Sequence, residues 1–271
     1  MAAAKAARGD GTAFDLPGRP GGSDAALLLH GLTGTPFEVR PVADRLSRAG
    51  VRCLAPLLPG HESPEALART TWRDWVDGAR RGLAALGETR RTMVVGSSMG
   101  GLVACVLAAE NPGLVDGVAL LAPALELQPL GKLAGWLARH TPVARIFPAV
   151  SKGGGSDVSD PVARAANPCL DAIPFHAVAE LLDLQVHVEA LLPRVRCPAL
   201  VIAGALDGTV TAAGARRMSG RMGGGARFVL LSRSRHLVGI DVERERVAAD
   251  IQFFFDSIPV RSGARATEAA R

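Results

Sequence analysis

Short apolar runs alternate with helix-patterned segments along most of the chain. Runs at 25–29, 93–95 and 118–121 have the length and composition of fully buried strands. Two further strands are expected at 51–55 and 199–203. Strands that alternate with amphipathic helices are typical of a mostly parallel sheet flanked by helices. The pattern therefore predicts an α/β fold.

The start of the first helix has two interpretations. Thr35, Pro36 and Glu38 have the spacing of an N-cap, a first-turn proline and the acid of a capping box. Pro41 would remove a hydrogen bond from a helix that began there, which favours a start nearer Arg40. The pattern leaves this boundary open.

The alternation of strand and helix stops after 118–121. Helical segments fill residues 124 to about 192, a glycine-rich link lies at 152–156, and no strand is expected between them. Such a break predicts a helical cap inserted into the core. We therefore expect a loose leader with one short edge strand near Phe14 at 1–24, an α/β core at 25–123 and 197–258, the cap at 124–196 and a flexible tail at 259–271.

Composition narrows the class of protein. The chain has 271 residues, of which 48% are hydrophobic, and its net charge of +5 comes from scattered basic residues without aromatic interleaving. This disfavours nucleic-acid binding. The sequence contains no apolar stretch of about 18 residues, so no membrane span is expected, and no signal peptide is visible. Four widely spaced cysteines suggest neither zinc nor disulfides, and we expect a reducing, cytoplasmic location. The oligomeric state is left open.

Gly96, Ser98 and Gly100 form a Gly-x-Ser-x-Gly pattern where the apolar run at 93–95 meets a helical segment. This is the form of a nucleophile elbow, a sharp strand-to-helix turn that projects its central side chain. A side chain at 96 or 100 would collide with neighbouring backbone. A serine at a helix start also lies near N–H groups that stabilise developing negative charge. Alone, the pattern equally fits a simple turn of small residues.

The rest of the chain supplies an acid and a base. Asp207 follows the apolar run at 199–203, and His236 lies just past the next expected strand. Carboxyl ends of parallel strands share one sheet edge, so Ser98, Asp207 and His236 are expected to meet there. The order Ser, Asp, His is that of the α/β-hydrolases. Asp241 is a second acid near the histidine, but capping of the last helix explains it better.

Further segments of the chain have recognisable motifs. They are His30-Gly31-Leu32-Thr33-Gly34-Thr35-Pro36, Pro59-Gly60-His61, Thr70-Thr71-Trp72-x-Asp74-Trp75, Gly96-x-Ser98-Met99-Gly100-Gly101, Cys197-Pro198-Ala199-Leu200 leading to Asp207, and His236 with Asp241. Together they resemble the motifs of bacterial carboxylesterases and monoacylglycerol lipases of the α/β-hydrolase superfamily. The resemblance extends over about residues 24–257 and is weakest across the expected cap. It implies an α/β-hydrolase fold with a small helical cap.

The resemblance also implies roles for individual residues. Ser98 would be the nucleophile, His236 the general base and acid, and Asp207 the group that orients the imidazole. Backbone N–H groups of Leu32 and Met99 would form the oxyanion hole. No cofactor and no metal is implied. The expected partner is a small-molecule ester with an apolar acyl chain.

Three positions depart from the family pattern. Glu62 replaces a glycine that usually follows His61, and Ser97 replaces a common leucine before the nucleophile. Ala122 stands where some monoacylglycerol lipases carry a polar residue that helps to hold glycerol. The last departure bears on the preference for monoglycerides more than on ester chemistry.

Two classes of function remain. The first is a serine hydrolase that cleaves short-to-medium acyl esters or monoacylglycerols through an acyl-enzyme on Ser98, with thioesterase, amidase and C–C hydrolase activities as alternatives. The second is a non-catalytic ligand-binding protein of the same fold, which an intact triad disfavours. A serine nucleophile also argues against epoxide hydrolases and dehalogenases. Apolar cap residues would either roof the acyl chain or dock the cap: Leu130, Leu133, Trp136, Leu137, Ile146, Phe147, Ile173, Phe175 and Leu181.

Overall fold

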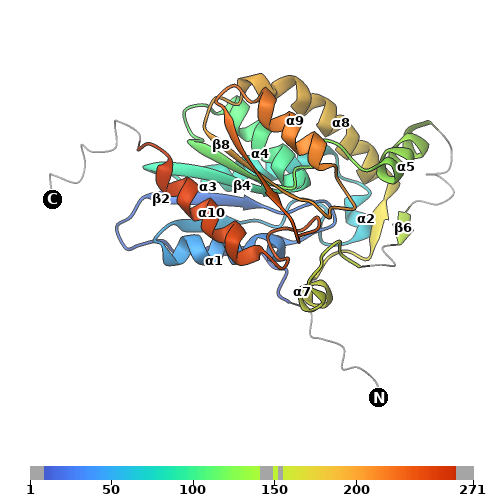
Figure 1. The fold of residues 1–271 in the computed structure, drawn as a ribbon, viewed down its shortest axis with the longest axis horizontal. Helices are drawn as coiled ribbons and strands as arrows, with labels where there is room; N and C mark the ends of the chain where they lie inside the picture. The colour runs from blue at the N-terminus through green and yellow to red at the C-terminus, as the bar shows by residue number, and fades with distance from the viewer. Residues whose placement is uncertain (1–8, 141–148, 152–154, 261–271) are drawn as a thin grey trace, which may run out of the picture.

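The computed structural model describes residues 9–140, 149–151 and 155–260, and its centre is a seven-stranded sheet (Figure 1). The first two strands in the sheet are antiparallel, and all other neighbours are parallel. The predicted α/β fold and the edge strand near Phe14 are confirmed. The strands lie in the order β1 (Phe14–Leu16), β3 (Arg52–Ala55), β2 (Asp24–Leu29), β4 (Arg91–Ser97), β5 (Gly117–Leu121), β8 (Ala199–Gly204) and β9 (Ala226–Leu231).

Helices cover both faces of this sheet (Figure 1). On one face α1 (Arg40–Arg48) packs against α10 (Arg244–Ser257). The opposite face carries α3 (Trp72–Ala85), α4 (Met99–Glu110), α8 (Phe175–Leu191) and α9 (Ala212–Arg221). The short α2 (Pro64–Leu67) follows β3, and the 3-10 turn η2 (Leu192–Arg194) follows α8.

Strand β2 shows why these strands read as continuous apolar runs. Leu27 and Leu29 belong to the apolar cluster on the α4 side, whereas Ala26 and Leu28 belong to the cluster under α1 and α10. Successive side chains of a strand point to opposite faces, so a strand covered on both faces needs apolar residues at every position. The continuous apolar run therefore results from burial of the strand on both faces of the sheet.

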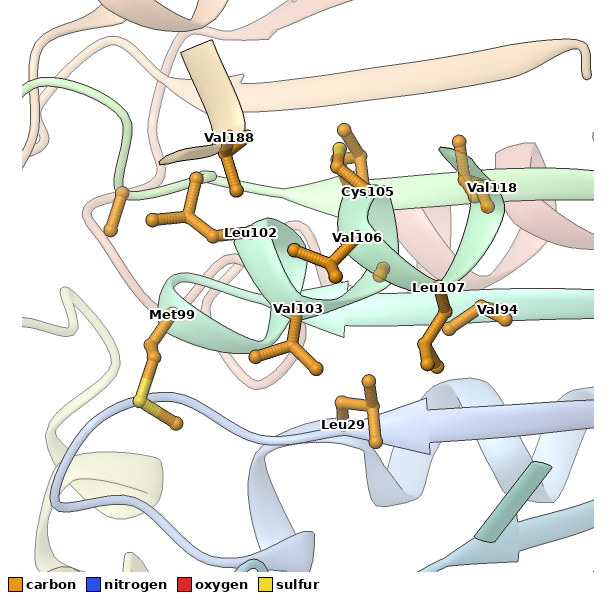
Figure 2. Packing of buried hydrophobic residues seen from close by; sticks show 14 of the residues in the cluster. Leu29, Val94, Met99, Leu102, Val103, Cys105, Val106, Leu107, Val118 and Val188 are labelled. Atoms are coloured by element: carbon orange, nitrogen blue, oxygen red, sulfur yellow. The ribbon is translucent and has the colours of Figure 1, made fainter. Parts of the chain in front are cut away.

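Helix α4 lies at the centre of the molecule. All residues from Met99 to Ala109 are buried, so every side of this helix packs against other parts of the protein. Figure 2 shows Val103 pointing toward Leu29 of β2, while Leu102 lies near Val188 of α8. A helix enclosed between sheet and helices carries apolar residues all round.

The first helix begins at Arg40, the later of the two starts considered. A 3-10 turn, η1 (Pro36–Val39), precedes it, and the expected capping box is absent. Among the described residues no N–H donates to the Thr35 hydroxyl. The Glu38 carboxylate instead accepts from the N–H of Gly31, because the preceding loop folds back over it. Pro41 fits the first turn of α1, where no N–H donor is needed.

The expected cap contains strands as well as helices. Between β5 and β8 the chain forms α5 (Pro129–His140), β6 (Ala149–Ser151), α7 (Pro161–Ala166), β7 (Ala172–Pro174) and α8, and β6 pairs antiparallel with β7. The expectation of helical pieces alone was wrong, because three-residue strands are too short to show an alternating pattern. One side of α8 joins the apolar cluster of α4, so this helix packs as part of the core layers. The domain limits at 124 and 196 stay a prediction.

No helix of the described ranges has the length and apolarity needed to cross a bilayer. Most of the expected tail, residues 261–271, and the start of the leader, residues 1–8, lie outside the described residues.

Two phenylalanines of α10 test how much the packing on this face contributes. Phe255 is 1% exposed beneath the Arg91 guanidinium, whereas Phe253 is 68% exposed on the same helix. We expect Phe255→Ala to lower the free energy of unfolding by about 3–5 kcal/mol. Phe253→Ala, the matched control, should cost less than about 0.5 kcal/mol. Urea unfolding measures both, and equal losses would contradict the packing described.

Candidate active site

Three loops at the carboxyl ends of β4, β8 and β9 carry the predicted site residues. Ser98 follows β4, Asp207 follows β8, and His236 follows β9. These strands lie close together in the sheet, with β5 between β4 and β8. The structure therefore brings the three side chains to one edge, where ligands bind in open parallel sheets.

The three side chains form one hydrogen-bonded chain. His236 Nε2 lies 2.9 Å from Ser98 Oγ, and His236 Nδ1 lies 2.8 Å from Asp207 Oδ2. All three residues are buried. Because the carboxylate can only accept, Nδ1 donates to Asp207 and Nε2 accepts from the serine hydroxyl. This tautomer leaves the imidazole able to take a proton from Ser98.

The backbone at Ser98 is strained, as the elbow pattern predicts. Its φ of 52° and ψ of −114° lie in a region that residues with side chains rarely adopt. A Cβ at Gly96 would overlap the carbonyl of Gly100, and a Cβ at Gly100 would overlap the carbonyl of Leu29. Such strain costs about 1–3 kcal/mol and persists only where surrounding packing enforces it.

Asp207 is held on both its side chain and its backbone. Its second oxygen, Oδ1, accepts from the N–H groups of Thr209 and Val210, each at 2.8 Å. Its backbone carbonyl accepts from Gln128 Nε2 at 2.9 Å. The carboxylate therefore keeps one oxygen directed at the imidazole.

Three carboxylates surround His236 and determine its basicity. Burial lowers the pKa of His236, but the negative charges of Asp207, Asp157 and Glu38 outweigh burial and raise that pKa above its ordinary value. A base with a raised pKa accepts the serine proton more readily. The imidazolium formed in that step would be stabilised by the same three groups.

Asp241 has a different role from the capping that its position suggests. Helix α10 begins at Arg244 with Glu243 as its N-cap residue, so Asp241 lies outside the helix. Its Oδ1 accepts from the N–H groups of Ser159 and Asp160, each at 2.9 Å, and from Val242. Its Oδ2 accepts from Arg235 N at 2.7 Å. The buried carboxylate thus ties the histidine loop to the segment before α7.

Glu38 lies in the site although its sequence position suggested a helix cap. Its carboxylate is buried, lines the same cavity as Ser98, and accepts from Gly31 N at 2.9 Å. A Cβ at Gly34 would overlap this carboxylate, which explains the glycine there. The acid therefore supports the loop that contains Leu32. In the sequence, the nearby glycines Gly31 and Gly34 are the one sign that a buried side chain packs against this loop.

Two buried histidines lie behind this loop. His30 Nδ1 donates to Gly31 O at 2.9 Å, and its Nε2 accepts from Leu58 N at 3.0 Å, so the ring must be neutral. The rings of His30 and His61 are 4.6 Å apart. Burial and the neighbouring His61 hold the pKa of His30 well below its usual range. Burial also lowers the pKa of His61, to about 4.

A cavity of about 390 Å³ opens over Ser98 and His236. Leu32 lines this cavity. Met99 is the first residue of α4, and N–H groups in the first turn of a helix have no partner within the helix. Among the predicted apolar cap residues, Leu130, Leu133 and Trp136 are exposed, Leu137 is half-buried, and Ile146 and Phe147 lie outside the described residues. Those that line the cavity are Leu130, Ile173, Phe175 and Leu181.

Cofactor and metal ligands were not expected. Within the ranges that the structure describes, no group of three or more His, Cys, Asp or Glu residues is arranged to hold a metal ion. Cys53, Cys105, Cys169 and Cys197 are free thiols, and burial raises the pKa of Cys197 to about 11. Cys53, Cys105 and Cys197 lie in or against the apolar clusters and serve as packing residues.

Fold and site together define a serine hydrolase of the α/β-hydrolase class. Residues 23–243 match the family model Hydrolase_4, described as serine aminopeptidase, S33. The chain belongs to this family and is an enzyme.

Individual relatives agree with this assignment. The thermostable monoacylglycerol lipase of Bacillus sp. (strain H-257) is 28% identical over 237 residues, which are 86% of this chain and 91% of that protein. A structure from a study of the metagenome-derived lipolytic enzymes LipS and LipT is 24% identical, with a TM-score of 0.81, over 92% of this chain and 99% of that one. The monoacylglycerol lipase of Paleococcus ferrophilus gives a TM-score of 0.74 at 21% identity, over 91% of this chain and 98% of the other. The resemblance noted in the motifs is confirmed.

The neutral histidines predict how stability depends on pH. Unfolded histidines protonate near pH 6.5, whereas His61 in the folded chain resists protonation down to about pH 4. Stability from His30 and His61 is therefore full above about pH 6.5 and is lost as the pH falls. Each proton changes the free energy of unfolding by about 1.4 kcal/mol per pH unit. His61→Gln should make the loss between pH 6.5 and 5 shallower.

Urea unfolding at several pH values measures this slope. The control is His176→Gln, which makes the same replacement at an exposed histidine on α8. Equal slopes for His61→Gln and the wild type would contradict the assignment.

Proposed function

We propose that the chain hydrolyses carboxylic esters through an acyl-enzyme on Ser98. The observation that carries the proposal is the hydrogen-bonded chain from Ser98 Oγ through His236 to Asp207 beneath a cavity with mostly apolar walls. The names of two relatives support ester substrates: the monoacylglycerol lipase of Bacillus sp. (strain H-257), and a carboxylesterase of Bacillus subtilis that is 35% identical over 95 residues, 34% of this chain.

The first half of the reaction forms the acyl-enzyme. His236 Nε2 takes the proton of Ser98 as Oγ attacks the ester carbonyl, and the tetrahedral intermediate forms. The N–H groups of Leu32 and Met99 would donate to its oxyanion, and each such donor is typically worth about 3–4 kcal/mol. His236 then gives its proton to the leaving alcohol. Asp207 keeps the imidazole in the required tautomer and stabilises its positive charge.

The second half repeats these steps with water. His236 removes a proton from a water molecule, whose oxygen attacks the acyl carbonyl, and the proton returns to Ser98 as the acid leaves. Proton transfers and oxyanion stabilisation thus involve the same groups twice.

The shape of the cavity supports short-to-medium acyl chains. Its volume of about 390 Å³ lies at the lower end of pockets that enclose small ligands. Leu127, Leu130, Phe175 and Leu181 supply apolar walls, which suit an acyl chain and offer few partners to a charged substrate. Monoacylglycerols remain part of the proposal because two relatives carry that name. A cytoplasmic location stays a prediction.

Replacing the nucleophile gives the first test. Ser98→Ala should lower the turnover of p-nitrophenyl esters at least about 1,000-fold, because no acyl-enzyme can form. The melting temperature should change little, since alanine keeps the Cβ and the backbone geometry of this turn and loses only the hydroxyl. A ladder from acetate to palmitate, with 1-monolauroylglycerol beside it, measures turnover. Turnover retained in the variant would rule out Ser98 as the nucleophile.

A fluorophosphonate extends this test to other substrates. Wild-type protein that is labelled at Ser98 but silent on every ester would point to an amide, thioester or carbon–carbon bond. Absence of labelling would favour a non-catalytic binding protein.

The wall formed by α5 gives the second test. Ala134 lines the cavity, whereas Leu133 is exposed on the same helix. Ala134→Phe should shift the preferred acyl chain toward shorter esters, because the larger ring fills space needed by the distal carbons. The control Leu133→Phe should leave the chain-length profile of kcat/KM as it is in the wild type. An unchanged profile for Ala134→Phe would remove this wall from the acyl site.

A further inference from the structure

Asp157 joins the expected cap to the loops that carry the acid and the base. It lies between β6 and α7, two residues past the start of the described range 155–260. Its backbone carbonyl accepts from His236 N at 3.1 Å and from Leu237 N at 3.2 Å. The histidine is therefore attached through its own main chain to this segment.

The side chain of Asp157 binds the other loop. Its Oδ2 accepts from Gly208 N at 2.8 Å and from Thr209 Oγ1 at 3.2 Å, in the turn directly after Asp207. Its Oδ1 accepts from Arg235 Nη1 at 2.6 Å, next to the histidine. Hydrogen bonds to a charged acceptor are among the stronger ones, and this side chain is mostly shielded from solvent.

We propose that Asp157 is a positioning residue, which holds the turn after Asp207 and the loop of His236 at the separation that the hydrogen-bonded chain from Ser98 requires. The inference rests on the proposed function, because it assigns the work of Asp157 to the same site. Asp157 lines the cavity beside Ser98 and His236, and its hydrogen bonds run to the backbone of the loops that carry the catalytic side chains and to Thr209 and Arg235.

A second tie shows that the side chain is not needed to dock the segment. Asp241 accepts from the N–H groups of Ser159 and Asp160 and from that of Arg235. We expect this connection, and the bonds from the carbonyl of Asp157, to persist when only the Asp157 carboxylate is changed. A variant at 157 is thus expected to fold with the segment in place and the acid loop released.

The charge of Asp157 adds a second, separable effect. Charged groups near His236 are Asp207, Asp157 and Glu38, and Arg235 lies between Asp157 and the histidine loop. Neutralising Asp157 removes one of three negative charges that raise the pKa of His236. The acidic limb of the kcat/KM profile, which reports the base of the free enzyme, should then move to lower pH.

The experiment compares Asp157→Asn, Asp157→Ala and Asp157→Glu with a matched control. Asp160→Asn makes the same chemical change three residues further on, where asparagine can still accept from Val162 N and Ala163 N as the cap of α7. Readouts are kcat, KM and the pH profile for p-nitrophenyl butyrate, and the rate of Ser98 labelling by a fluorophosphonate. Melting temperatures verify folding.

We expect kcat to fall roughly 10- to 100-fold in Asp157→Ala, because small displacements of catalytic groups cost rates of this size. Asp157→Asn keeps one acceptor oxygen and should lose less than Asp157→Ala. Asp157 lines the cavity, but the apolar walls are unchanged in these variants, so KM should change less than about twofold. Asp157→Glu keeps the charge, so its acidic limb should stay at the wild-type pH while kcat recovers part of the loss. Asp160→Asn should have the same kcat and the same acidic limb of the pH profile as the wild type.

Equal kcat values for the Asp157→Ala and Asp160→Asn variants would overturn the proposal. So would a loss that appears only as a lower melting temperature, with kcat of the folded fraction unchanged. If Asp157→Asn and Asp157→Ala do not fold, Asp157→Glu decides, and wild-type kcat in that variant contradicts a positioning role. Failure of the proposed function is distinct: wild-type protein would cleave no ester, yet labelling rates would still rank the same variants.

Discussion

The hydrogen-bonded chain from Ser98 through His236 to Asp207 is the interaction that the other features of this site serve. Three polar side chains gathered in a buried place cost free energy unless each group finds a partner. Here the imidazole satisfies the serine and the acid at once, at 2.9 and 2.8 Å. Such an arrangement tolerates little displacement, so the loops that carry these residues must be fixed by bonds of their own.

The fold fixes these loops with buried polar groups. Asp207 keeps its second oxygen on two N–H groups of its own turn, and Asp241 gathers four N–H groups around the histidine loop. Glu38 and His30 do the same for the loop that holds Leu32. Each of these four side chains is matched to backbone groups, which allows it to lie in the interior without a large penalty.

The segment between β5 and β8 does more than cover the site. Residues of α5, β7 and α8 form the apolar walls of the cavity, while Asp157 and Gln128 bond to the turn of Asp207. The groups that would select the acyl chain and those that steady the acid thus lie on one stretch of chain. A change in how this stretch packs would be transmitted to both binding and catalysis.

By itself the sequence determined the features whose causes are local or periodic. Two-sided burial produces apolar runs, the elbow requires small residues at 96 and 100, and strand ends place Ser98, Asp207 and His236 at one edge. These are short-range steric rules and a periodicity, so residues read in order suffice to predict them.

The tertiary structure decided everything that depends on a distant partner. Glu38 has the spacing of a helix cap but binds Gly31, Asp241 precedes a helix but binds the segment before α7, and β6 and β7 become strands only by pairing with each other. In each case the local pattern suggested a nearby partner, and the folded chain supplied a partner further along the sequence. The reason is physical: the interior must satisfy all buried donors together, and that balance is set only when the chain is folded.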